Sequence, residues 1–229
     1  ECYSGMFYGC SSLTTAPTLP ATELAFGCYK SMFWQCTSLT AAPELNATAL
    51  SEDCYDGMFY GCTSLTTVPQ ILPATELYRR CYNCMFSNCT SLTTAPELPA
   101  TELDEFCYQS MFWGCTNLNY IKCLATNISV HMCTDSWVKE VPNSGTFIKH
   151  PDMYDWTTGI NGIPEGWAIE NPEIYYVTFT AEEDNSSIGL EQLSTNQTLL
   201  YSTDTTNWNT FDTSTNISIN KGDDVYVRG

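Results

Sequence analysis

The cysteines of this chain could do chemistry, since it holds 13 of them among 229 residues. Ten of them form pairs eight residues apart: Cys2/Cys10, Cys28/Cys36, Cys54/Cys62, Cys81/Cys89 and Cys107/Cys115. Cysteines at a fixed spacing suit either disulfides or a metal site. No matched pair of CxxC motifs, and no CxxC with suitably spaced histidines, supports zinc, so no metal is expected.

The spacing also opposes disulfides within a pair. Two cysteines eight residues apart on a helix are separated by roughly 12 Å, whereas a disulfide needs Cα atoms within about 7 Å. We therefore expect these ten to be small buried apolar residues in a ladder. Cys84, Cys123 and Cys133 fall outside the ladder. A Cys123–Cys133 disulfide that locks the end of the array is one hypothesis.

The sequence contains few residues in patterns that are typical of a catalytic site. The chain contains no nucleophile elbow, no HExxH and no phosphate-binding glycine loop. Its two histidines, His131 and His150, offer little for a catalytic triad, although 26 acidic residues leave a glycosidase pair open. Glu182-Glu183 and Asp223-Asp224 match no EF-hand loop and are expected to be solvated turns. We expect no enzyme activity and no cofactor.

A repeat of 26 or 27 residues organises the first half of the chain. Each unit opens with Cys-Tyr, and Leu24, Cys28, Met32 and Cys36 then fall four apart, which predicts one stripe of a helix. The Thr-Ser-Leu-Thr-Ala-Ala-Pro segment after Cys36 suits a short strand. The predicted fold class is α+β: a leucine-rich-repeat solenoid with one helix and one strand per repeat, followed by a small antiparallel β-domain.

The motif MFxGCTSLTTAPELPATEL, present in five related copies, resembles the BspA-like leucine-rich repeats of bacterial surface proteins and some phages. The resemblance covers residues 1 to about 128, and the following residues 133–169 resemble the segment that commonly closes such arrays. It implies an adhesin or recognition protein without catalysis, at a bacterial cell surface or on a phage virion, for instance in a tail fibre.

Positions that differ between the copies are the candidate binding residues. They are expected on the helical side, facing away from the apolar stripe, and include exposed aromatic rings of the kind that protein or glycan ligands contact. Unrestrained drift of exposed positions explains the variation equally simply. The candidates are Phe26, Trp34, Glu52, Asp53, Tyr78, Arg79, Arg80, Asp104, Glu105, Phe106 and Trp113.

Three domains are predicted: the solenoid over 1–133, an array-closing cap and linker over 134–172, and a small β-sandwich-like domain over 173–229. The last is indicated by alternating segments at 174–180, 198–202, 216–219 and 225–227. Because the chain begins inside the repeat pattern, we expect it to be a fragment. Its N-terminal repeat has no cap, so self-association through that repeat is a further expectation.

The charge balance restricts the partners. With 8 basic against 26 acidic residues, the formal net charge is −18, which argues against nucleic acid and anionic membranes. No apolar stretch approaches the roughly 20 residues that membrane insertion needs. The leading expectation is an extracellular protein that binds a surface protein or glycan through the helical side of the solenoid. The alternative is a structural spacer, filament or virion component with no ligand of its own.

Overall fold

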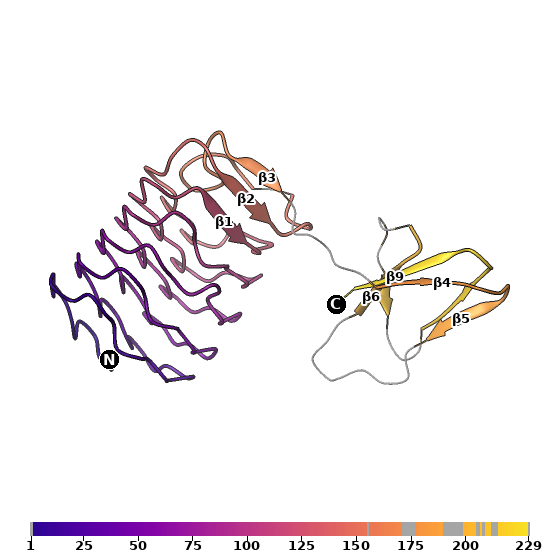
Figure 1. Cartoon of the computed structure of the whole chain (residues 1–229), viewed down its shortest axis with the longest axis horizontal. Coiled ribbons are helices and arrows are strands. Elements are labelled where there is room, and N and C mark those ends of the chain that lie inside the picture. Colours follow the sequence, from indigo (N-terminus) through magenta and orange to yellow (C-terminus); the bar gives the residue numbers. More distant parts are fainter. Residues whose placement is uncertain are drawn as a thin grey trace. The chain divides into compact units, whose positions relative to one another are not determined.

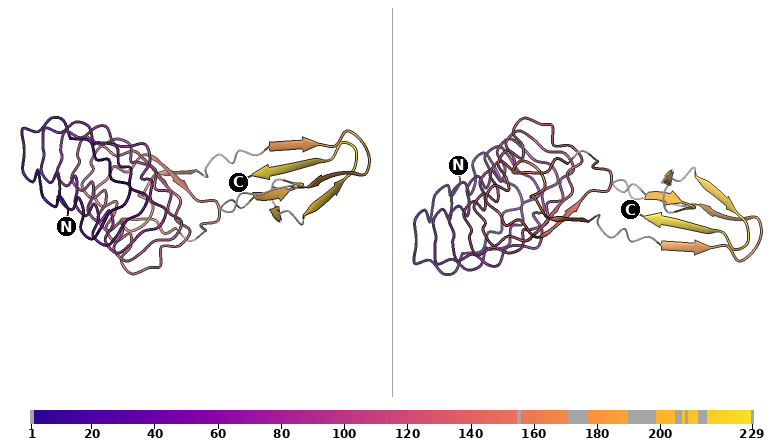
Figure 2. Two further views of the ribbon diagram at one scale, coloured as in Figure 1. Left: turned by 90° about the horizontal axis from the view of Figure 1, so that it is seen from below. Right: turned by 90° about the horizontal axis from the view of Figure 1, so that it is seen from above.

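The structure, a computed structural model, describes residues 2–154, 156–170, 177–189, 199–204, 207, 209–211 and 215–228. The chain divides into two compact units, Glu1–Pro172 and Glu173–Gly229. The first unit contains all five repeats as successive coils of chain lying side by side (Figures 1 and 2). We call this arrangement the turn stack.

No helix occurs among the described residues, so the predicted α+β fold class and the leucine-rich-repeat solenoid are wrong. The structure is all-β and coil, with small sheets. In each repeat the chain from the opening to the second cysteine is here called the turn segment. In this segment and at the residue directly before it, left-handed residues alternate with residues whose φ is not positive. In the second repeat, for example, Gly27, Tyr29, Ser31 and Gln35 have φ values of 63°, 61°, 52° and 56°.

This alternation divides the backbone amides into two sets. The amide of Met32 donates to the carbonyl of Tyr29 at 3.2 Å and closes a turn, whereas the amide of Phe33 donates to Met58 of the next repeat at 2.9 Å. An α-helix would instead direct its interior amides to the residue four earlier. Cys28, Met32 and Cys36 are nevertheless all buried, so the four-residue spacing of apolar side chains does not require a helix here.

The core of the turn stack consists of columns of equivalent side chains. Tyr29, Tyr55 and Tyr82 stack with ring centroids 5.8 and 5.7 Å apart. A parallel column holds Phe7, Phe33, Phe59, Phe86 and Phe112, with centroids 5.4 to 5.9 Å apart. The helix-stripe residues Cys28, Met32 and Cys36 are buried as expected, although no helix carries them.

The opposite side of the stack carries short parallel strands. β1 (Tyr120–Cys123), β2 (Thr146–Lys149) and β3 (Ala168–Glu170) form a parallel sheet in that order. Earlier repeats contribute only isolated parallel bridges, such as Ala41 with Thr67 and Thr94 with Tyr120. The strand expected after each second cysteine is therefore reduced to single bridges in the early repeats.

A sixth turn segment follows the five recognised repeats. Cys133 lies 26 residues after Cys107, and Met132, Ser136 and Glu140 have φ values of 50°, 55° and 67°, as their equivalents do in other repeats. The amide of Phe112 donates to Trp137 at 2.8 Å, which continues the stack. The buried Trp137 ring then contacts Tyr108, Phe112, Phe147 and Trp156, and so closes both aromatic columns.

The second unit consists of antiparallel strands around a small core of Ala181, Phe211, Ile217, Ile219 and Val225. One sheet has the order β4-β9-β6-β7, and β5 pairs with β8. The strands are β4 (Val177–Thr180), β5 (Ser186–Gly189), β6 (Leu199–Ser202), β7 (Asn209–Phe211), β8 (Asn216–Ile219) and β9 (Asp224–Arg228). Residues 174–176 and 198 of the expected strands lie outside the described residues.

Candidate functional site

The candidate binding residues lie in, or directly before, the turn segments. Phe26 and Tyr78 are 49% and 42% exposed, and Glu52 is also exposed. The others are half-buried: Trp34, Asp53, Arg79, Arg80, Asp104, Glu105, Phe106 and Trp113. Most of them therefore contact neighbouring repeats, rather than projecting freely into solvent.

Trp34 is enclosed by rings of the adjacent repeats. Tyr8 stacks on one side with centroids 5.9 Å apart, and Tyr60 stacks on the other at 3.8 Å. Lys139 lies over the ring of Trp113 with its ammonium 5.0 Å from the centroid. The structure thus does not present Trp34 as a free face on which a sugar could stack.

Lys30 links two carboxylates of the following repeat. Its ammonium lies 3.2 Å from Asp53 and 2.9 Å from Asp56. Burial alone would lower the pKa of Lys30, but the hydrogen bonds and charges of Asp56 and Asp53 outweigh it and raise that pKa. Burial raises the pKa of Asp56 against the opposing effect of Lys30. This group is an internal charge network, and within it Oδ1 of Asp53 is buried without a hydrogen-bond partner among the described residues.

Arginine and aromatic side chains meet where the chain enters the turn segments that begin at Cys81, Cys107 and Cys133. The guanidinium carbons of Arg79 and Arg80 lie 5.3 and 5.6 Å from the ring centroid of Phe106. The His131 ring meets Phe106 edge-on at 5.2 Å, and Nε of Arg79 lies 3.6 Å from Glu105. We call Arg79, Arg80, Glu105, Phe106 and His131 the basic–aromatic cluster.

Arg80 differs from Arg79 in having no polar partner among the described residues. Its side chain forms no ion pair or hydrogen bond there, and its Nε is buried without an acceptor, whereas its backbone amide donates to the carbonyl of Glu105 at 3.0 Å. Asp104, a further candidate, accepts the amide of Glu105 at 2.6 Å and stabilises the local turn. Arg80 is thus the side chain of this face with the most unused hydrogen-bonding capacity.

The cysteines are structural. All thirteen are free thiols, so the Cys123–Cys133 disulfide is not formed. In repeats two to five the second cysteine donates its thiol to a carbonyl of the preceding repeat, as Cys62 does to Phe33 at 3.1 Å. Burial raises the pKa of Cys62 to about 12 and that of the half-buried Cys84 to about 11. Thiolate formation at Cys62 and Cys84 is therefore suppressed.

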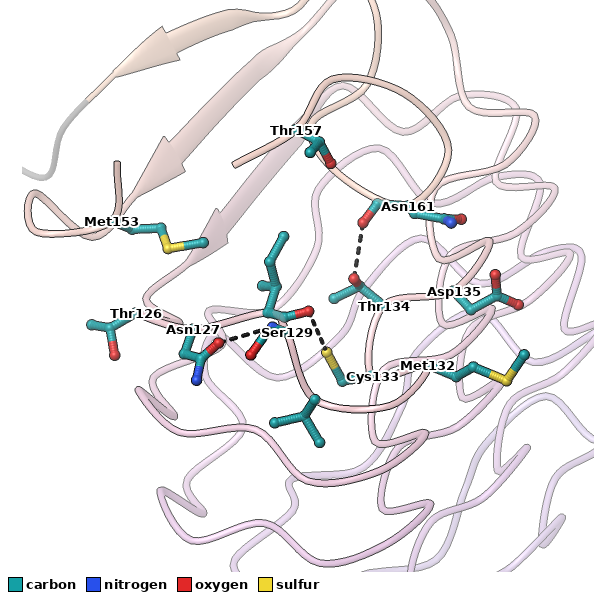
Figure 3. Close-up of a pocket in the computed structure, with 12 residues that line it drawn as sticks. Thr126, Asn127, Ser129, Met132, Cys133, Thr134, Asp135, Met153, Thr157 and Asn161 are labelled. Atoms are coloured by element: carbon teal, nitrogen blue, oxygen red, sulfur yellow. Dashed lines mark hydrogen bonds between the residues drawn. The ribbon is translucent and has the colours of Figure 1, made fainter. Parts of the chain in front are cut away.

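A cavity of about 480 Å³ lies beside the sixth turn segment (Figure 3). The carbonyl of Asn161 accepts from Thr134 at 2.8 Å, and Oδ1 of Asn127 accepts the amide of Ser129 at 2.8 Å. Cys133 donates its thiol to Ile128 at 3.4 Å. The twelve lining residues include one carboxylate, Asp135, and no histidine.

Metal-binding groups and membrane-spanning helices are both absent from the described ranges. No group of three or more His, Cys, Asp or Glu side chains there could hold a metal ion. No helical segment in those ranges has the length and hydrophobicity of a bilayer-spanning helix. Comparisons with family models, curated proteins and solved structures found no match.

Sequence reasoning missed three members of these groups: His131, Lys30 and Asp56. His131 occupies the position of Glu105 one repeat later, because Cys133 continues the period. Counting the sixth turn segment would have placed it in the cluster. The Lys30 network had no comparable signal, since its ion pairs depend on how two repeats face each other.

Proposed function

We propose that this protein is a non-catalytic recognition protein that binds a surface protein or glycan through the basic–aromatic cluster and the adjoining turn segments. A bacterial cell surface or a phage virion is the location that the resemblance of the repeats favours. The main support for this proposal is that Arg79 and Arg80 both lie over the ring of Phe106. Equivalent positions hold Phe26 and Gly27 or Glu52 and Asp53 in other repeats, so the backbone does not require two arginines there.

The variable residues support recognition for a second reason. The stack fixes its core through repeated Tyr, Phe, Met and Cys columns, while residues at the cluster change charge and size from one repeat to the next. Interfaces are enriched in arginine and aromatic residues, which combine large contact area with directed hydrogen bonds. Two of the eight basic residues of the chain are neighbours in this cluster.

The test is binding of the labelled chain to a panel of bacterial cells and host matrix proteins. A variant with Arg79→Ser and Arg80→Ser is expected to lose binding while its circular dichroism spectrum is unchanged. Lys122→Ser is the matched control, because Lys122 pairs with Glu97 at 3.0 Å on the strand side of the stack. Equal binding by all three chains would contradict recognition through this face.

A structural spacer is the second candidate. It is favoured by the mutual contacts of many variable residues, such as Trp34 with Tyr60 and Lys30 with Asp56. These contacts join adjacent repeats and would stiffen a rod. Absence of binding to every member of the panel would favour this candidate over recognition.

A further inference from the structure

We propose that Arg79 and Arg80 bind a single carboxylate presented by a segment of a partner protein. The proposal rests on the proposed function and specifies the chemistry of the ligand at the basic–aromatic cluster. Arg80 supplies the principal hydrogen bonds, Arg79 supplies a second guanidinium, and Phe106 holds both in place.

Arg80 has side-chain hydrogen-bond donors that are not used within the described chain. A guanidinium carries five N–H donors and stays charged at every physiological pH. Arg80 is half-buried, its Nε is shielded from water, and no acceptor lies within hydrogen-bonding reach among the described residues. A buried donor without an acceptor is costly, and native proteins rarely retain one without a reason. A ligand carboxylate would bind the outer N–H groups of the guanidinium, since Nε itself is shielded from solvent.

The backbone of Arg80 adopts a conformation that is unfavourable for an arginine. Arg80 has φ = 58°, in the left-handed region that glycine occupies at no steric cost, and Gly27 fills the equivalent position two repeats earlier. An arginine here carries a conformational cost and yet makes no ion pair within the described chain. Residues kept against local stability are concentrated at functional sites.

The two guanidiniums are held in place by Phe106 in the absence of a ligand. Both guanidiniums lie against the Phe106 ring, 5.3 and 5.6 Å from its centroid, so their freedom is reduced before a ligand arrives. Glu105 is the one carboxylate paired with Arg79, at 3.6 Å, and both side chains of that pair are more than 40% exposed. Such a long, exposed contact is weak, so an incoming carboxylate can replace it.

The surroundings favour a protein segment over an acidic polysaccharide. A chain with a net charge of −18 repels a polyanion, and Asp56 lies close enough to Arg80 for the two charges to interact. A single carboxylate among neutral residues avoids most of this repulsion. Tyr78, 42% exposed and directly before Arg79, adds an aromatic contact of the kind common in protein interfaces.

The experiment selects a library of displayed random twelve-residue peptides on the full chain. Enriched peptides are expected to share one Asp or Glu within an otherwise uncharged sequence. Synthetic copies should bind Arg80→Gly about tenfold or more weakly than the unchanged chain, and Arg80→Lys should be intermediate because lysine lacks the planar fork. Replacing the shared Glu by Gln in the peptide should weaken binding to a similar extent. Lys122→Ala is expected to bind like the unchanged chain.

Thermal unfolding separates a ligand role from a structural one. Arg80→Gly should unfold at the same or a higher temperature, since it relieves the left-handed conformation and leaves no partner unpaired. A lower unfolding temperature would show that Arg80 supports the fold and would overturn the proposal. Enriched peptides without a carboxylate, or unaffected by Arg80→Gly, would overturn it as well.

Hyaluronan, an acidic polysaccharide, is the second probe. Binding of hyaluronan that Arg80→Gly abolishes, without any carboxylate-dependent peptide, would overturn the assignment to a protein partner. If the cell and matrix panel responds to the arginine variants while neither probe binds, the carboxylate inference fails and recognition stands. If the panel shows no response either, both proposals fail.

Discussion

The indole of Trp34 occupies the space that a side chain at position 57 would need. A Cβ atom added to Gly57 would lie 2.7 Å from Cζ3 of Trp34, closer than such atoms approach in proteins. The same relation links Asn88 with Gly114, where a Cβ would lie 2.4 Å from the Asn88 side-chain oxygen. Some of the variation between repeats therefore reflects compensation between neighbours, independent of any ligand.

This relation predicts that Gly57→Ala destabilises the protein more than Gly5→Ala does. Both glycines have φ = 61° at equivalent positions, so the backbone cost, about 1 kcal/mol, is shared. A Cβ at Gly5 meets nothing closer than 3.9 Å. We expect Gly57→Ala to lose roughly 1–3 kcal/mol more in urea unfolding, as overpacking does. Equal losses would contradict the packing explanation, and Trp34→Ala should remove most of the difference.

Closure of the aromatic columns predicts a large effect at Trp137. Its ring is fully buried, and Nε1 donates to the carbonyl of Gly162 at 2.7 Å. Trp137→Ala should reduce the free energy of unfolding by about 3–5 kcal/mol, and Trp137→Phe by less. Trp113→Phe is the control, because its Nε1 has no partner and a small change is expected. Similar losses for both phenylalanine variants would argue against a closing role for Trp137.

The buried thiols predict a loss of stability at high pH. Burial raises the pKa of Cys62 from 9.0 to about 12, so the folded state keeps a proton that the unfolded state releases. This contribution is fully present below pH 9.0 and is lost as the pH rises toward 12. Cys62→Ala should flatten the decline by up to about 1.4 kcal/mol per pH unit. Parallel pH profiles for both proteins, measured by urea unfolding, would refute this assignment.

The Lys30 network predicts that its cation is needed for stability. Lys30→Met keeps the aliphatic stem but leaves Asp53 and Asp56 facing each other, and both side chains are only 15% exposed. We expect a loss of roughly 1–3 kcal/mol, moderated because Lys30 is partly solvated. Adding Asp56→Asn should recover part of it. Unchanged thermal stability of Lys30→Met would mean that water already compensates these carboxylates.

The repeat allowed the core to be predicted well and the backbone poorly. Cys28, Met32 and Cys36 are buried where the four-residue spacing placed them. The helix inferred from that spacing is absent, because Tyr29, Ser31 and Gln35 have positive φ values that an α-helix does not allow. The distinction depends on where each amide finds its acceptor. For Phe33 that acceptor is Met58, 25 residues away.

The candidate site was predictable only in part. Comparison of the repeats singled out Arg79, Arg80 and Phe106, and the structure brings these three together. The same comparison selected Trp34 for its supposedly exposed ring, which the neighbouring rings enclose. Exposure on a stacked surface depends on the residue at the same position one repeat before and after. The exposure of a ring in this stack is therefore predicted from the residues at the equivalent positions of the neighbouring repeats, and not from its own position alone.

The sequence alone determined the period and the residues that form the buried columns. The tertiary structure decided the backbone conformation, the sixth turn segment and the contacts between variable residues. The physical reason is the range of the interactions. Burial follows from the local periodicity of apolar side chains. The amides of the turn segments and the rings of the columns instead find their partners one repeat away, so only the stacked chain reveals them.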